Sequence, residues 1–271
     1  MEQARVGLIG FGAIGRDIAA MLGEGKAGRA RLVGILVRNP DKVRKDEAGD
    51  GVLVTNEAAE LWRCRPDIVV ECAGHAAVRG YAEAALAEGA HLIVVSAGAL
   101  ADEALLARLT AAAAEAGRQV LVPSAAIGGL DRIAAASLGP MGEVRLVTRK
   151  PPAAWIGTPV ERQIDLASLS EPVCVFEGAA REAARRFPES VNVSAALSLA
   201  GIGMDATRVS VHVDPTISHN AHRIEAEGTF GRIELEVRNA PSAANPKTGV
   251  IVAMSVVKAI RQFTAPIVIG I

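Results

Sequence analysis

The stretch RVGLIGFGAIG, residues 5–15, places three glycines in the pattern G-x-G-x-x-G directly after a short apolar run. The apolar run predicts a buried strand, and the residues after the loop predict a helix. In this pattern the first glycine permits a tight turn, the second lets a ligand approach the backbone, and the third lets helix and strand pack closely. Because the amides at a helix start attract anions, the loop is predicted to hold the pyrophosphate of a dinucleotide. The predicted cofactor-binding residues here are Gly10, Gly12, Ala13, Ile14 and Gly15.

Strands and helices alternate from this loop to about residue 123, which is typical of a doubly wound parallel sheet. Further strands are predicted at Leu32–Val37, Asp67–Cys72, Leu92–Ser96 and Val120–Val122. Helices are predicted at Arg16–Leu22, Asn56–Cys64, His75–Glu88 and Ala101–Ala116. Half of all residues are hydrophobic and only 3% are aromatic, as in proteins built on buried parallel strands. The sequence therefore predicts an α/β fold with a Rossmann domain.

After residue 123 the pattern changes to alternating strands with one polar face, mixed with helices. Predicted strands are Arg145–Thr148, Arg208–Val213, His222–Glu227 and Arg232–Val237, the last two forming a hairpin. Predicted helices are Leu130–Leu138, Ala179–Phe187, Val191–Leu199 and, after the cap-like Asn245-Pro246, Lys247–Phe263. We expect residues 1–123 together with 246–271 to form the dinucleotide-binding domain. Residues 124–245 are expected to form a second, α+β domain that binds the substrate.

Composition excludes several classes of function. The formal net charge is -1, so the chain lacks the basic excess that nucleic acid or an anionic membrane attracts. No apolar run reaches the roughly 18–20 residues that span a bilayer, and the first residues do not resemble a signal peptide. The three cysteines, Cys64, Cys72 and Cys174, show no metal-ligand spacing. We expect reduced thiols in a cytoplasmic protein, and no metal site.

Two further segments are predicted to contact the cofactor. Strict NAD binders usually carry an acid at the end of the second strand, but this chain has Val37-Arg38-Asn39 there. Arg38 is predicted to pair with a 2′-phosphate, which would allow NADP alongside NAD; the alternative is a solvated surface charge. Cys72, Ala73 and Gly74 follow the third strand at the ligand-binding edge and are predicted to line the path of the riboses.

The whole chain resembles the L-aspartate dehydrogenase family. The matching stretches are, in order, GLIGFGAIG, ECAGH, VSAGAL, PSAAIGGLD, TRKPP, NVSAAL, ISHNAHRIEAEGTFG and NPKTG. The resemblance implies a two-domain homodimer that oxidises L-aspartate with NAD or NADP. The first product would be iminoaspartate, which hydrolyses to oxaloacetate and ammonia. The sequence leaves open whether iminoaspartate passes to a partner enzyme for nicotinamide synthesis.

The resemblance also implies roles for individual residues. The backbone of Ala126 and the residue Asn192 would contact the nicotinamide, His222 would be the catalytic histidine, and the second domain would form the dimer. The family often has Gly where Ala125 stands, which is a mild departure.

The spacing of the five histidines favours the same residue. His222 shares strand parity with Ile224 and Ala226, so it is expected on the protected face of its strand. Its unperturbed pKa of about 6.5 suits deprotonation of an amine and activation of water. The alternatives are a purely structural role for His222, or His219, in the loop before the hairpin, as the catalytic histidine. His91 is expected to be structural, and His212 to lie on the solvated face.

A substrate with two carboxylates requires cations. The candidates are Arg149 and Lys150, at a predicted strand end, and Lys247, at a predicted helix start. For each of them an ordinary surface salt bridge is the alternative. Ser124 is a candidate for a further hydrogen bond to the substrate.

Two other functions fit the same pattern. One is a homoserine- or dihydrodipicolinate-type oxidoreductase, which a panel of amino acids would separate from an aspartate enzyme. The other is an NAD(P)-sensing protein without turnover, which predicts tight cofactor binding and no activity.

Overall fold

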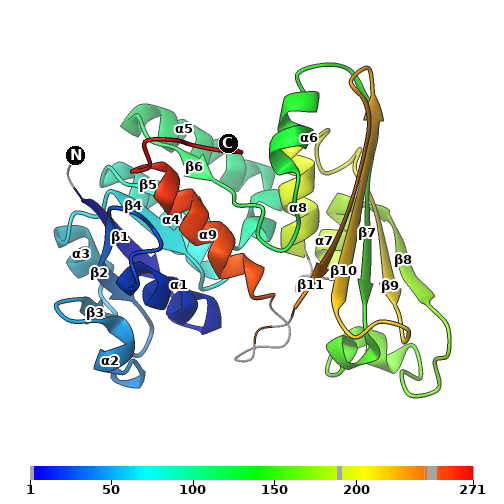
Figure 1. The fold of residues 1–271 in the computed structure, drawn as a ribbon, viewed down its shortest axis with the longest axis horizontal. Coiled ribbons are helices and arrows are strands. Elements are labelled where there is room, and N and C mark those ends of the chain that lie inside the picture. Colours follow the sequence, from blue (N-terminus) through cyan, green and yellow to red (C-terminus); the bar gives the residue numbers. More distant parts are fainter. Residues whose placement is uncertain (1–2, 188–190, 241, 243–248, 271) are drawn as a thin grey trace. The chain divides into compact units, whose positions relative to one another are not determined.

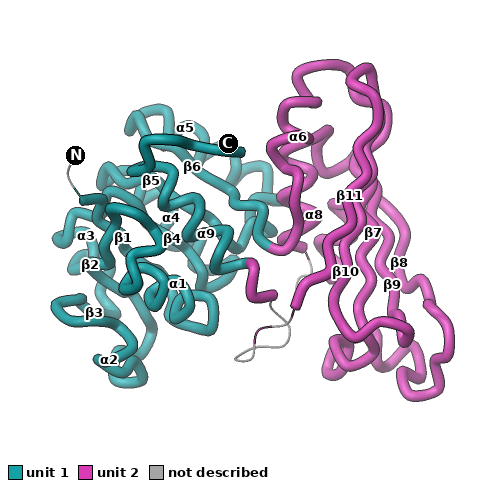
Figure 2. Tube along the Cα trace, viewed as in Figure 1, with its two compact units in different colours: residues 1–125, 252–271 teal, residues 126–251 magenta. Residues whose placement is uncertain are grey.

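The structure is a computed structural model, and it describes residues 3–187, 191–240, 242 and 249–270. The chain forms two compact units (Figure 2). Unit 1 comprises residues 1–125 and 252–271, and unit 2 comprises residues 126–251. Each unit has its own sheet.

Unit 1 contains a six-stranded sheet in the order β3-β2-β1-β4-β5-β6, with every pairing parallel. Its strands are β1 (Ala4–Ile9), β2 (Ala30–Leu36), β3 (Leu53–Thr55), β4 (Ile68–Glu71), β5 (His91–Val94) and β6 (Val120–Leu121). This is the strand order of a dinucleotide-binding Rossmann domain, so the predicted α/β class is confirmed. The strand order reverses between β1 and β4, and ligands bind at the carboxyl ends of the strands at such a point.

Helices connect these strands (Figure 1). They are α1 (Ala13–Gly23), α2 (Lys45–Ala48), α3 (Ala58–Arg63), α4 (His75–Ala87), α5 (Glu103–Ala116) and the 3-10 helices η1 (Pro40–Lys42) and η2 (Ala97–Ala101). The last helix, α9 (Ile251–Gln262), brings the chain back to unit 1. Its predicted start at Lys247 lies outside the described residues. No helix in the described part of the chain is long and apolar enough to cross a membrane.

Unit 2 contains a mixed five-stranded sheet in the order β11-β10-β7-β9-β8. Its strands are β7 (Met141–Lys150), β8 (Val173–Ala179), β9 (Arg208–Val213), β10 (Asn220–Gly228) and β11 (Gly231–Asn239). The pair β7–β9 is parallel and the other pairs are antiparallel. Its helices are α6 (Leu130–Ala136), α7 (Ala180–Arg186), α8 (Val191–Ala200), η3 (Pro152–Trp155) and η4 (Pro159–Arg162). The α+β character predicted for this region is therefore present.

The two faces of the second sheet differ. Helices α6, α7 and α8 lie along one face of this sheet (Figure 1). Leu146, Val211 and Ile224 share one face by register and are buried, and Val144 on the same face lies beside Gly201, which follows α8. The opposite face carries ion pairs such as Arg145–Glu177 and Arg223–Glu234. Because neighbouring residues on a strand point to opposite faces, strand parity decides which side chains reach the helix-covered face.

Candidate active site and dinucleotide-binding loops

The three glycines of the first loop have two different roles. Gly10 has φ +100°, and a Cβ there would lie 2.8 Å from the Cβ of Ala73. A Cβ on Gly15 would lie 2.6 Å from the carbonyl oxygen of Gly10. By contrast, no described atom lies within 4 Å of the Cβ position of Gly12, which is exposed. The protein's own packing therefore requires Gly10 and Gly15, whereas Gly12 keeps the backbone open to a ligand.

The start of α1 suits an anion. Gly12 is its N-cap, and among the described residues no side chain caps the helix and no acid stands in its first turn. The first amides of a helix lack partners within the helix, and the helix dipole adds a partial positive charge. Together with the open Gly12 surface, these features fit the pyrophosphate of a dinucleotide.

The end of β2 carries the residues expected near the adenosine ribose. Arg38 is exposed. Asn39 is exposed too, and its side-chain oxygen accepts a hydrogen bond from the amide of Asp41 at 3.2 Å, which caps η1. The oxygen of Asn39 is therefore engaged in the turn, and Arg38 is the side chain at this strand end that suits a 2′-phosphate.

The loop after β4 packs against the glycine loop. The Cys72 thiol donates to the carbonyl oxygens of Ile9 and Gly10, at 3.5 and 3.4 Å. Burial raises the pKa of this thiol, with a smaller contribution from the neighbouring charge of Glu71, so it stays protonated. Cys72 thus supports the loop from inside rather than offering a reactive thiolate. Ala73 is exposed.

Glu71, the last residue of β4, is a residue that the sequence analysis missed. Its side chain is buried, and its carboxylate accepts four hydrogen bonds from Ala73, Gly74 and Ser96. Burial raises the pKa of Glu71, and these hydrogen bonds oppose the rise. The available signal was one acidic residue ending the otherwise apolar strand IVVE, because a buried charge requires partners.

His222 lies on β10 in register with Thr148 on β7. It is 4% exposed, and its Nδ1 atom lies 3.1 Å from the Thr148 hydroxyl. Burial and the nearby positive charge of Lys150 lower the pKa of His222 to about 3. Its imidazole is therefore neutral at neutral pH, on the helix-covered face.

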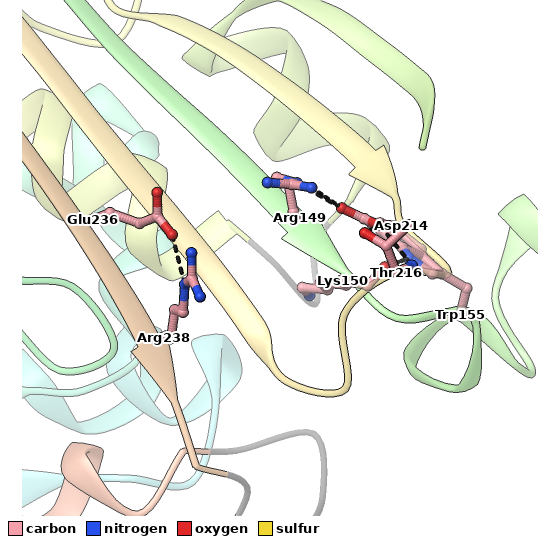
Figure 3. Close-up of polar contacts among 7 residues, drawn as sticks. All are labelled: Arg149, Lys150, Trp155, Asp214, Thr216, Glu236 and Arg238. Carbon is pink, nitrogen blue, oxygen red and sulfur yellow. Dashed lines mark hydrogen bonds and ion pairs between the residues drawn. The ribbon is translucent and has the colours of Figure 1, made fainter. Parts of the chain in front are cut away.

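Lys150 ends β7 and shares the face of Thr148 by strand alternation. Its ammonium group lies 5.4 Å from the ring centroid of Trp155, a cation–π arrangement. Trp155 is buried and donates its indole N–H to the Lys150 carbonyl at 3.4 Å. Figure 3 shows Lys150 and Trp155 beside the end of this strand. The structure thus brings Lys150 near the predicted catalytic histidine.

Arg149 lies on the opposite face. It pairs with Ala221 in the β7–β10 register, and with Ala221 and Arg223 it lines a hollow of about 300 Å³ on that face. Its guanidinium binds the carboxylate of Asp214 (Figure 3), with Nε at 2.6 Å. The structure therefore separates Arg149 from His222, although Arg149 and Lys150 are neighbours in sequence.

Asp214 is the buried partner in this ion pair. Its carboxylate also accepts hydrogen bonds from the amide and hydroxyl of Thr216, at 2.8 and 2.6 Å. Its own amide donates to the Lys150 carbonyl at 2.9 Å. Burial opposes ionisation of Asp214, but the bonds from Thr216 and Arg149 outweigh it and lower the pKa. The Asp214 cluster therefore fixes the end of β7, from which Lys150 projects.

The other histidines lie elsewhere. His219 is exposed, with its Nδ1 atom 2.6 Å from the Ser218 hydroxyl. His91 accepts the amide of Gln119 at 3.3 Å and packs on Phe263, a structural role. His212 lies in register with Arg149, on the face away from His222, and is half-buried.

The segment expected near the nicotinamide is held by hydrogen bonds to residues far away in the sequence. The Ser124 hydroxyl lies 3.3 Å from that of Ser255, and the amide of Ala125 donates to Ser255 at 3.0 Å. Ala125 has φ +50°, a left-handed conformation that favours glycine. Alanine where the family often has glycine therefore places a non-glycine residue in a strained backbone conformation. In unit 2, the Ala126 carbonyl accepts the side-chain amide of Asn239 at 2.8 Å.

Two other predicted residues complete the comparison. Asn192 stands in the first turn of α8 and is half-buried. Lys247 lies outside the described residues.

Known proteins match the chain over both units. A family model described as "Aspartate dehydrogenase, C-terminal" matches residues 131–263, and "Homoserine dehydrogenase, NAD binding domain" matches residues 10–123. L-aspartate dehydrogenase of Cupriavidus necator is 43% identical over 259 residues, covering 94% of this chain and 96% of that protein. L-aspartate dehydrogenase 2 of Bordetella bronchiseptica is 45% identical over 266 residues, covering 98% and 99%.

A solved structure agrees with these matches. The crystal structure of aspartate dehydrogenase from Thermotoga maritima has a TM-score of 0.78 and 25% sequence identity, and the match covers 98% of this chain and 99% of that one. The homoserine dehydrogenase family model covers residues 10–123 only, whereas the aspartate dehydrogenase relatives are 43–45% identical over 94–98% of the chain, so the homoserine- or dihydrodipicolinate-type alternative is not favoured. The chain belongs to the L-aspartate dehydrogenase family.

Proposed function

We propose that this protein catalyses the reversible, NAD(P)-dependent oxidative deamination of L-aspartate to iminoaspartate, which hydrolyses to oxaloacetate and ammonia. The observation that carries the proposal is that the buried, neutral His222 and the positively charged Lys150 lie near one another on the same face of a sheet. A neutral imidazole accepts a proton, and an ammonium group binds a carboxylate. The family supplies the substrate, because the relatives are named L-aspartate dehydrogenases.

Unit 1 binds the cofactor in this proposal. The amides of Gly12, Ala13 and Ile14 at the start of α1 bind the pyrophosphate, while Gly10 and Gly15 set the loop. Arg38 binds the 2′-phosphate of NADP, and Ala73 and Gly74 border the riboses. Ala126 and Asn192 contact the nicotinamide, as the family resemblance implies. The bound dinucleotide supplies the hydride acceptor, and the chain's own residues orient the substrate and move protons.

His222 acts as the base. Transfer of a hydride from the substrate Cα requires a neutral amine, so the substrate ammonium must first lose a proton. Thr148 occupies Nδ1 of the imidazole, which leaves Nε2 for that proton. Once that proton has passed to solvent, Nε2 is again unprotonated and takes a proton from the water that attacks the iminium carbon.

The substrate carboxylates are bound on the helix-covered side. We assign one of them to Lys150, which shares that side with His222. Ser124, His219 and Lys247 are retained as candidate contacts from the sequence. Arg149, which binds Asp214 on the opposite face, is assigned to the scaffold instead.

The experiment is a steady-state assay of reduced-cofactor formation with L-aspartate and with a panel of other amino acids, using NAD and NADP. The variant His222→Ala should keep its cofactor affinity and lose turnover by about 100-fold or more. His212→Ala, a half-buried histidine on the other face, is the matched control and should keep turnover. Cofactor binding without turnover on any amino acid would indicate a sensing protein and refute the proposal.

The family resemblance also supports a homodimer formed through unit 2 and a cytoplasmic location with reduced thiols. In the described part of the chain Cys64, Cys72 and Cys174 are free, which is compatible with a reducing compartment. Light scattering coupled to size exclusion measures the molar mass directly; a mass of one chain at micromolar concentration would refute the dimer. Fractionation of the source cells would test the location.

A further inference from the structure

The carboxylate of Glu71 occupies the point of unit 1 where the strand order reverses. Glu71 ends β4 and lies in register with Ile9 on β1 and with Val94 on β5. Ile9 leads directly into Gly10, the first residue of the phosphate loop. The side chain of Glu71 is 1% exposed. A charged group is thus buried beneath the cofactor-binding edge, although the proposed reaction does not use it.

Both carboxylate oxygens are engaged. Oε1 accepts the amides of Ala73 and Gly74, each at 2.8 Å, and the Ser96 hydroxyl at 3.0 Å. Oε2 accepts the amide of Ser96 at 3.1 Å. Ser96 follows β5 and is the N-cap of η2. One side chain therefore ties the loop after β4 to the end of the next strand.

We call the Glu71 carboxylate with its bonds to Ala73, Gly74 and Ser96 the Glu71 clamp. It reaches the phosphate loop through Ala73. The Cβ of Ala73 lies 2.8 Å from the position that a Cβ on Gly10 would occupy, so the two loops are in close contact. The Cys72 thiol, in the same loop, bonds the carbonyl of Gly10. A displacement of the loop at residues 72–74 would therefore remove the support beneath Gly10.

The clamp also governs where an anion is attracted. The loop amides that precede α4 already face a carboxylate, whereas the described residues place no capping side chain at the start of α1. Helices α1 and α4 both begin at this edge of the sheet, and the carboxylate of Glu71 makes the start of α4 unfavourable for a phosphate.

We propose that Glu71 is a positioning residue for the dinucleotide: its buried carboxylate holds the loop at residues 72–74 against Gly10 and reserves the start of α1 for the pyrophosphate. The inference rests on the proposed function, since it concerns the cofactor of that reaction. Glu71 touches neither substrate nor cofactor, so its effect is on cofactor affinity and not on the chemical step.

The test is Glu71→Gln, which keeps the shape and one acceptor oxygen but sets an NH₂ group against the amide of Ser96. We expect the Kd for NADH, measured by calorimetry, to rise about 10-fold, equivalent to about 1.4 kcal/mol. Ser96→Ala removes one of the four bonds and should raise the Kd less, by about 3-fold. Glu88→Gln, at an exposed glutamate of the same unit, is the matched control and should leave the Kd unchanged.

Two readouts separate positioning from a merely structural role. Turnover at saturating cofactor should stay within about 2-fold in Glu71→Gln, so that the KM for the cofactor changes and kcat does not. Hydrogen exchange of the amides of Ala73 and Gly74 should quicken. Faster exchange with an unchanged Kd in both Glu71→Gln and Ser96→Ala would overturn the inference; should Glu71→Gln not fold, an unchanged Kd in Ser96→Ala overturns it alone. Absence of nucleotide binding by the unsubstituted protein would refute the proposed function itself.

Discussion

The ion pair between Arg149 and Asp214 gives the sharpest prediction about unit 2. The Asp214 side chain is 0% exposed, whereas that of Arg149 is 38% exposed. Removing one partner of a fully buried pair costs about 3–5 kcal/mol, and exposed pairs are worth about 0–1 kcal/mol. In Asp214→Asn the amide oxygen keeps the two bonds from Thr216, while the NH₂ group faces the guanidinium. We therefore expect Asp214→Asn to destabilise unit 2 by about 2 kcal/mol, an intermediate value.

A double-mutant cycle measures the interaction free energy between Arg149 and Asp214. Arg149→Met leaves the Asp214 carboxylate buried with Thr216 alone, and should also cost about 2 kcal/mol. Because the pair is lost only once, the double variant should cost little more than either single variant, which gives a coupling of about 2 kcal/mol. Additive effects would refute the assignment of a shared interaction.

Tryptophan fluorescence reports on the correct unit. The chain has two tryptophans, of which Trp62 belongs to unit 1 and Trp155 to unit 2. In a Trp62→Phe background, urea unfolding followed by the buried Trp155 measures unit 2 without assuming that both units unfold together. A loss below about 0.5 kcal/mol in Asp214→Asn, within the range of ordinary surface substitutions, would contradict the prediction.

The same variants separate a scaffold role for Arg149 from a substrate role. If Arg149 belongs to the scaffold, Arg149→Met should change the KM for L-aspartate by less than about 3-fold, because no carboxylate contact is lost. A rise of about 30-fold with unchanged stability would return Arg149 to the substrate site. The pKa of Asp214 is lowered in the fold, so its stabilising contribution is full above the unfolded value of about 3.9 and is lost as the pH falls through the folded pKa.

Three further substitutions test other parts of the structure. Arg38→Asp should raise the Kd for NADP at least about 10-fold more than that for NAD, and equal effects would mean that Arg38 does not touch the 2′-phosphate. Thr148→Val removes the hydroxyl at His222 Nδ1 and should lower kcat about 10-fold, whereas Thr148→Ser should retain it; equal rates would refute orientation by Thr148. Ala125→Gly relieves φ +50° at a small entropic cost and should stabilise the protein by about 0.5 kcal/mol in thermal unfolding, so a lowered Tm would contradict the strain.

Strand parity explains why the sequence could place His222 on the protected face. The β10–β11 hairpin pairs without interruption from Asn220 to Gly228, so the alternation read from the sequence also holds in space. The strand β9 has the same bounds in the sequence analysis and in the structure, Arg208–Val213, because its alternation is equally regular. Patterns of period two are reliable where no bulge interrupts them.

The same rule shows where sequence reasoning stopped short. The strand predicted to end at Thr148 continues to Lys150, so Arg149 and Lys150 alternate instead of sharing a loop. At a predicted strand end, both cations are candidate substrate contacts; as neighbours within the strand they lie on opposite faces. The strand β8 was not predicted at all, and a register shift between Cys174 and Phe176 interrupts its pattern.

Hydrogen bonds between residues far apart in the sequence could not be predicted, for a different reason. The bond from Ser96 to Glu71 joins residues 25 positions apart, and no local pattern encodes it. The short strand β3, Leu53–Thr55, was missed because three residues carry too little periodicity to be recognised. Parallel pairing at the sheet edge, rather than local propensity, sets its conformation.

Burial of His222 lowers its basicity, and in the proposed reaction this effect depends on whether substrate is bound. With no substrate bound, desolvation and the charge of Lys150 keep the imidazole of His222 neutral and weakly basic. When Lys150 binds one substrate carboxylate in the proposed reaction, that carboxylate offsets the charge of the Lys150 ammonium group, and the second carboxylate offsets the charge of the substrate's own ammonium group. The pKa of His222 therefore rises when the anionic substrate arrives, at the step where the amine must lose its proton. In the proposed reaction Lys150 would therefore do more than bind a carboxylate, because it would link the basicity of His222 to occupancy of the site.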